Sequence, residues 1–171
     1  MLKRSLLIIS LAATPLVAQQ PSATSQLKSA WENVRGYLMD AAMEVPESTY
    51  AFRPTPEVRT FGELIAHIAG AQDSFCAEAL GEKAPAEDAV EKATKSKAAL
   101  IEALRKSNDH CARAYAQSDI DAAKPVKASG GSDSRFSMLL LNTTHDSEHY
   151  GNIVTYMRMN HMVPPSSKPR K

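Results

Sequence analysis

Two histidines, His145 and His149, stand four residues apart in a segment whose apolar residues recur every three or four positions. Residues at i and i+4 of a helix lie on one face and one turn apart, so both imidazole rings can reach the same ion. Neutral imidazole is a good ligand for zinc, nickel, copper and iron. The apolar stripe predicted for this helix runs through Met138, Leu141, His145, His149, Ile153 and Tyr156. Because burying two imidazoles without partners is costly, their place in the middle of this stripe predicts a metal site.

A third histidine, His67, lies in the apolar segment 64–70, at the edge of the stripe that a helical wheel gives for this segment. Its position alone fits a core or boundary histidine as well as it fits a metal ligand. Together with the pair it would form a three-histidine site that leaves a position open to water or substrate, as in catalytic zinc sites. We expect His110 on the outer face of its helix and His161 in the loop after the last helix.

Polar side chains beside the pair are candidates for orienting the ligands or contacting a substrate. The wheel places Asn142 and Asn152 inward on the same helix, and Glu148 at about 60° from His145. All three residues also fit a simpler interpretation, as polar residues at the boundary of a helical bundle. The sequence identifies no general acid or base.

Four helices must position these residues, and prolines mark where the helices are interrupted. We predict helices over residues 24–45, 60–81, 87–117 and 134–160, and no strand. Thr60 and Glu63 have the spacing of a capping box, and Gly81 can end the second helix. Helices of this length bury their apolar stripes only against one another, so the predicted fold class is all-α, a single four-helix bundle.

Length and charge exclude several classes of protein. A chain of 171 residues suits one compact domain, and a formal net charge of +1 without a basic stripe argues against nucleic-acid binding. Residues 1–18 have the pattern of a signal peptide, with a positive start and an apolar run to Val17. The alternative is a membrane anchor, but the run is shorter than the ~20 residues that a spanning helix needs. We therefore expect a secreted or periplasmic protein without stable membrane insertion after cleavage, a bundle over 24–163 and a disordered tail over 164–171.

Three further segments form a recognisable pattern. They are His145 to Ile153 with the following Tyr156-Met157-Arg158 and Val163-Pro164-Pro165-Ser166-Ser167, the run Gly62-Glu63-Leu64-Ile65-Ala66-His67, and Arg53-Pro54-Thr55-Pro56. This pattern resembles the DinB-like family of four-helix-bundle proteins over essentially all of the chain after the signal peptide. The resemblance implies up-down-down-up connectivity and one divalent metal ion, zinc or nickel or else iron, held by His67, His145 and His149. It also implies a homodimer as an expected assembly.

The two cysteines, Cys76 and Cys111, are expected late in the second and third helices and facing inward. The connectivity that the resemblance implies makes these helices parallel, which would bring their C-terminal thirds together. A disulfide is then predicted, and an oxidising compartment would permit it. The alternative is a pair of free buried thiols.

Two classes of function are compatible with these residues. The first is a metal-dependent hydrolase or thiol transferase that acts on a small-molecule substrate, since the family resemblance implies transferases and isomerases that use low-molecular-weight thiols. Export would separate the protein from such cytoplasmic thiols. The second is a non-catalytic protein in which metal stabilises the bundle or a small ligand is bound. A metal site that opens to solvent would favour the enzyme.

Overall fold

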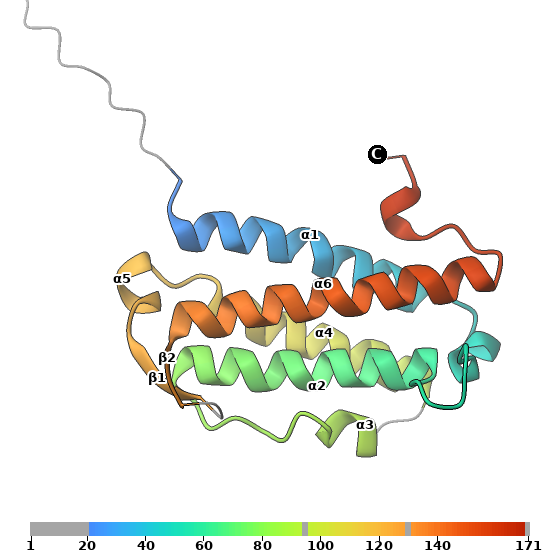
Figure 1. The fold of residues 1–171 in the computed structure, drawn as a ribbon, viewed down its shortest axis with the longest axis horizontal. Helices are drawn as coiled ribbons and strands as arrows, with labels where there is room; N and C mark the ends of the chain where they lie inside the picture. The colour runs from blue at the N-terminus through green and yellow to red at the C-terminus, as the bar shows by residue number, and fades with distance from the viewer. Residues whose placement is uncertain (1–20, 94–95, 129–130, 170–171) are drawn as a thin grey trace, which may run out of the picture.

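The computed structural model describes residues 21–93, 96–128 and 131–169, and its elements follow one another along a mostly helical chain (Figure 1). They are α1 Ala23–Glu44, the 3-10 helix η1 Glu47–Ala51, α2 Phe61–Leu80, α3 Ala89–Ala93, α4 Lys97–Ala114, α5 Asp119–Ala122, β1 Pro125–Ala128, β2 Gly131–Ser134, α6 Arg135–Met159 and the 3-10 helix η2 Pro165–Ser167.

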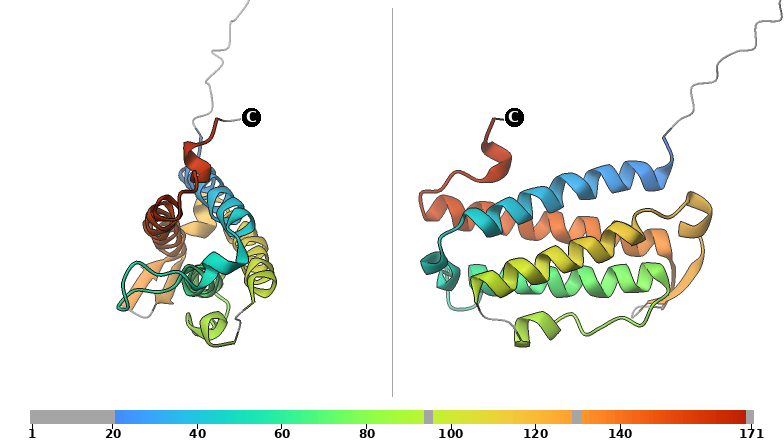
Figure 2. Two further views of the ribbon diagram at one scale, coloured as in Figure 1. Left: turned by 90° about the vertical axis from the view of Figure 1, so that its right-hand side faces the viewer. Right: turned by 180° about the vertical axis from the view of Figure 1, so that it is seen from behind.

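The four long helices α1, α2, α4 and α6 pack into one bundle (Figures 1 and 2). α1 and α6 run in one direction, and α2 and α4 run in the opposite direction (Figure 1). The predicted all-α fold with up-down-down-up connectivity is confirmed. Two consequences bear on function: α2 lies beside α6, and α2 and α4 are parallel, so their C-terminal ends lie at the same end of the bundle.

Local sequence fixes where the helices begin and end. The Thr60 hydroxyl accepts a hydrogen bond from the Glu63 backbone N–H, and the Glu63 carboxylate accepts one from the Thr60 N–H. This is the predicted capping box, which satisfies two otherwise unpaired donors. Gly81 ends α2 with φ 75°, a left-handed conformation that favours glycine. Ser134 caps α6 in the same way as Thr60 caps α2, through the Ser137 N–H.

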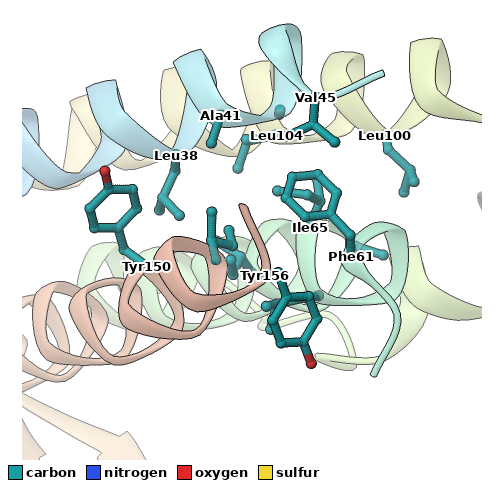
Figure 3. Packing of buried hydrophobic residues seen from close by; sticks show 14 of the residues in the cluster. Leu38, Ala41, Val45, Phe61, Ile65, Leu100, Leu104, Tyr150 and Tyr156 are labelled. Carbon is teal, nitrogen blue, oxygen red and sulfur yellow. The ribbon is translucent and has the colours of Figure 1, made fainter. Parts of the chain in front are cut away.

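The core is formed by apolar side chains that all four long helices contribute (Figure 3). Leu38 of α1, Ile65 of α2, Leu104 of α4 and Ile153 of α6 are fully buried. Burying a side chain of this size stabilises the fold by roughly 1.5–3 kcal/mol. The core therefore fixes the spacing of α2 and α6, the two helices that carry the three histidines.

The predicted third helix, 87–117, is wrong in its first part. α4 begins only at Lys97, because Ser96 caps it by accepting a hydrogen bond from the Ala99 N–H. Residues 82–93 instead run back alongside α2 and include the short α3 (Figure 1). At Gly70 of α2 the approach is so close that a Cβ atom would lie 2.0 Å from the Glu87 carbonyl oxygen.

A small hairpin was also not predicted. β1 and β2 pair antiparallel, with Pro125 opposite Ser134, at the end of the bundle where α6 begins (Figure 1). Strands of four residues that include glycine, serine and proline do not alternate between apolar and polar residues, which is the pattern from which a strand is recognised.

Residues 164–169, expected to be a disordered tail, return to the bundle. The Ser166 N–H donates a hydrogen bond to the Tyr150 hydroxyl, Pro165 is buried, and the Lys168 ammonium lies 2.6 Å from the Glu44 carboxylate. The predicted signal peptide, residues 1–18, lies outside the described residues. Within the described part of the chain, no helix is long and apolar enough to cross a membrane.

Candidate metal centre

The three predicted histidines meet where α2 and α6 lie side by side. His145 Nε2 lies 3.1 Å from His67 Nε2 and 3.0 Å from His149 Nε2. Each ring is partly buried, and the candidate ligand atoms all lie within 4.8 Å of one another. The helical spacing of four residues brings His145 and His149 together, and the packing of α2 on α6 adds His67.

The surroundings of the triad favour neutral imidazoles. Burial lowers the pKa of His67 to about 4, and the positive charge of Arg59 contributes to the shift. Burial, assisted by the other two histidines and Arg59, lowers the pKa of His145 to about 3. Burial also lowers the pKa of His149. Since a metal ligand must be unprotonated, these shifts leave the triad in its ligating form at neutral pH.

The donor set fits a divalent transition metal. His145 Nε2 lies at hydrogen-bond distance from the Nε2 atoms of both other histidines, yet each neutral ring has only one N–H to share between its two nitrogens. His145 Nε2 therefore cannot satisfy both of its neighbours, whereas one cation would satisfy all three. Three imidazoles are a common ligand set for zinc and suit nickel and iron as well.

Of the polar residues predicted beside the pair, Asn152 contacts the triad and Glu148 does not. Asn152 is exposed and not inward as predicted, and its Nδ2 atom lies 3.3 Å from His149 Nδ1. For His149 to bind metal through Nε2, its proton has to be on Nδ1, and the Asn152 amide has to be turned over so that its oxygen accepts that proton. Glu148 is exposed and forms no hydrogen bond to the triad among the described residues. His145 Nδ1 is buried without a described partner, and the Phe75 ring packs edge-on against the His145 ring.

Asn142 points into the core, as predicted, and its side chain bonds to another buried residue and not to the triad. It is fully buried, and its side-chain amide donates a 3.0 Å hydrogen bond to the Tyr115 hydroxyl. Asp146 is also fully buried and accepts a 3.1 Å hydrogen bond from Gln72. Burial raises the pKa of Asp146 well above its ordinary value. These residues belong to a polar cluster inside the bundle, behind the metal ligands.

The buried stripe of α6 is thus rotated from the predicted one. Asn142 and Asp146 lie at its centre, whereas Leu141 is 43% exposed and the two histidines lie at its edge. The prediction was wrong because it followed the apolar residues. Polar residues occupy the innermost positions here, where hydrogen bonds to Gln72 and Tyr115 make their burial tolerable.

A cavity of about 650 Å³ adjoins the triad at His149. Asn152 and Tyr156 of α6 line one wall, and Leu64 of α2 lines another. The rest comes from Glu63 of α2, from the segment between η1 and α2, which includes Arg53 and Arg59, and from Glu91 of α3. Sequence reasoning missed Arg59 and Glu91, because nothing in their spacing relates them to the histidines.

The two cysteines form the predicted disulfide. Cys76 of α2 and Cys111 of α4 are bonded, their Cα atoms lie 5.1 Å apart, and both residues are fully buried. The parallel C-terminal ends of these helices account for the pairing. His110, next in the chain to Cys111, lies between the carboxylates of Asp73 and Glu82 at 3.1 Å from each rather than in solvent, and it is separate from the triad.

The fold and the site together define a four-helix-bundle protein with a three-histidine cluster that could hold a metal ion. The family model of the DinB superfamily matches residues 26–153. The chain therefore belongs to the DinB superfamily.

Solved structures share this fold. A DinB-like protein from Bacillus cereus is 14% identical with a TM-score of 0.71, over 86% of this chain and 98% of that one. A DinB-like protein from Bacillus subtilis is 19% identical with a TM-score of 0.66, over 85% and 99%. The mycothiol-dependent maleylpyruvate isomerase is 16% identical with a TM-score of 0.63, over 78% and 65%. No functionally curated protein matches the chain.

Proposed function

We propose that this protein is an exported metal-dependent hydrolase that acts on a small molecule. His67, His145 and His149 hold one divalent ion, zinc or nickel in preference to iron. The observation that carries the proposal is the convergence of three imidazole Nε2 atoms, 3.0–3.1 Å between neighbours, beside an open cavity of about 650 Å³. A metal with a purely structural role has no need of such an opening.

Three neutral ligands leave the positive charge of the ion uncompensated, and the ion would supply the Lewis acidity that hydrolysis near neutral pH requires. The chain supplies the rest. Asn152 holds the His149 ring through Nδ1, and the Phe75 ring limits the movement of His145. The cavity lined by Leu64, Tyr156 and the two arginines admits and orients the substrate.

Thiol transfer is the second candidate. It is supported by the structural likeness to an isomerase whose name states its dependence on mycothiol. The disulfide between Cys76 and Cys111 favours hydrolysis instead, because disulfides persist in oxidising compartments, and reduced thiol cosubstrates are kept in the cytoplasm. The disulfide supports export for the same reason.

Metal analysis of the purified protein tests the site. After expression with zinc and nickel, we expect about one equivalent of metal in the wild type and none in His145→Ala or His149→Ala. His161→Asn is a matched control, because it removes a histidine outside the triad and asparagine tolerates the φ of 58° at this position. A metal-free wild type would contradict the proposal.

Activity decides between the candidates. We expect ester or amide hydrolysis that disappears with the metal and in the two alanine variants. Turnover that requires an added low-molecular-weight thiol would favour transfer. Full metal content with neither activity across broad substrate panels would favour the non-catalytic alternative, a bundle stabilised by metal.

A further inference from the structure

A positively charged side chain lines the cavity beside the triad and has no role as a metal ligand. Arg59, in the segment just before α2, lines the cavity together with His149. Arg59 and His149 border the same space, so one molecule bound in the cavity can contact both. A divalent ion in the triad would repel this guanidinium, whereas an anion in the cavity would be attracted to both.

Contacts on both sides hold Arg59 in place. The Tyr156 hydroxyl, on α6, donates a 2.8 Å hydrogen bond to the Arg59 carbonyl oxygen. The guanidinium donates through Nε to Glu91 Oε1 of α3 at 3.1 Å. Within residues 21–93, 96–128 and 131–169, the Nη groups of Arg59 donate no hydrogen bond, and the side chain is 42% exposed. The backbone of Arg59 is therefore anchored to the helix that carries two ligands, and the outer donors of its guanidinium remain available.

The carboxylates of the cavity already have partners. Glu63 accepts hydrogen bonds from the Thr60 N–H and from Arg53. Glu91 accepts from Arg59. Hydrogen bonds from its own backbone and from Thr55 lower the pKa of Glu57. None of these carboxylates forms a described hydrogen bond to the triad. Arg59 is paired with Glu91 through Nε, which leaves its Nη donors for a ligand in the cavity.

We propose that the small molecule bound at this site is an organic carboxylate whose carboxylate group is recognised by Arg59. This inference rests on the proposed function and specifies its substrate class. The planar guanidinium matches a carboxylate and can donate two parallel hydrogen bonds to it. Leu64, Val58 and the Tyr156 ring line the same cavity and would contact the apolar part of the molecule. Arg53, which is paired with Glu63, contributes charge at the outer rim.

Calorimetric titration with benzoate and with its neutral analogue benzamide tests the assignment. Both are titrated at constant ionic strength into zinc-loaded and metal-free protein. We expect wild type to bind benzoate more tightly than benzamide, and Arg59→Gln to bind benzoate at least about tenfold more weakly than wild type. Glu91→Gln is the matched control. It breaks the same ion pair but keeps the cation, so benzoate should bind with unchanged or higher affinity.

The results separate the two proposals. Equal affinity for benzoate and benzamide, no benzoate binding at millimolar concentrations, or full benzoate affinity in Arg59→Gln would overturn the role of Arg59. A loss of affinity in Glu91→Gln as large as in Arg59→Gln would also overturn it, because the ion pair and not the cation would then matter. Zinc content is measured on the same samples. A wild type without zinc contradicts the proposed metal site, and the metal-free titrations still decide the role of Arg59.

Discussion

Reduction of the Cys76–Cys111 disulfide should remove a large part of the stability of the bundle. The bond joins α2 and α4 across a sequence separation of 35 residues. The loop entropy that such a cross-link removes from the unfolded chain corresponds to about 4 kcal/mol. Small domains are stable by only about 5–15 kcal/mol in total, so the loss is large relative to the whole. The effect bears on the site, because Cys76 lies on the helix that carries His67.

Urea unfolding with and without a reductant measures this effect. We expect the reduced protein to unfold at lower urea, with a free energy of unfolding lower by about 4 kcal/mol. The dependence on urea should be steeper, because the uncrosslinked unfolded chain exposes more surface. Cys76→Ala/Cys111→Ala should resemble the reduced protein and should not respond to reductant. Two titratable thiols in the denatured, unreduced protein, or equal stability with and without reductant, would refute the reasoning.

Two further predictions concern the stability of the bundle. Gly70→Ala should destabilise the protein by about 1–3 kcal/mol in urea unfolding, because its Cβ would collide with the Glu87 carbonyl oxygen. The matched control Gly36→Ala, with no atom within 4 Å of its Cβ, should be neutral or stabilising, and equal effects of the two would contradict the close contact. Asp119 accepts hydrogen bonds from the Thr24 side chain and backbone, which lower the pKa of Asp119, so its contribution should be present at neutral pH and lost as the pH falls below about 4. Melting temperatures of wild type and Asp119→Asn should therefore converge in acid, and a constant difference down to the folded pKa would contradict this.

The parts of the fold that could be predicted are those that short-range chemistry determines. Thr60 and Glu63 cap α2 as their spacing predicts, and Gly81 ends it. The interruption of the helix at Ser96 was missed because the whole segment 87–117 has helical composition, and the contact of Glu87 with Gly70 is a tertiary effect. A helical wheel describes one helix at a time, so it cannot predict contacts between segments.

In the candidate site, too, only the residues related by local spacing or by the family resemblance could be predicted. His145 and His149 are related by helical spacing, and the family resemblance supplied His67, which the structure places at hydrogen-bond distance from His145. Arg59 and Glu91 approach the site through a loop and through α3, whose positions depend on packing alone. No pattern within the sequence could connect them to the histidines.

The corrected position of the histidine pair strengthens the case for chemistry. A pair at the centre of the α6 stripe would be enclosed by the core, and a metal bound there would be structural. The centre is instead occupied by Asn142 and Asp146, which bond to Tyr115 and Gln72 inside the bundle. His145 and His149 lie at the edge of the buried face, and His149 borders the cavity. With Asn142 and Asp146 in the innermost positions, the triad is half-buried, which is dry enough to keep the imidazoles neutral and open enough to admit a ligand.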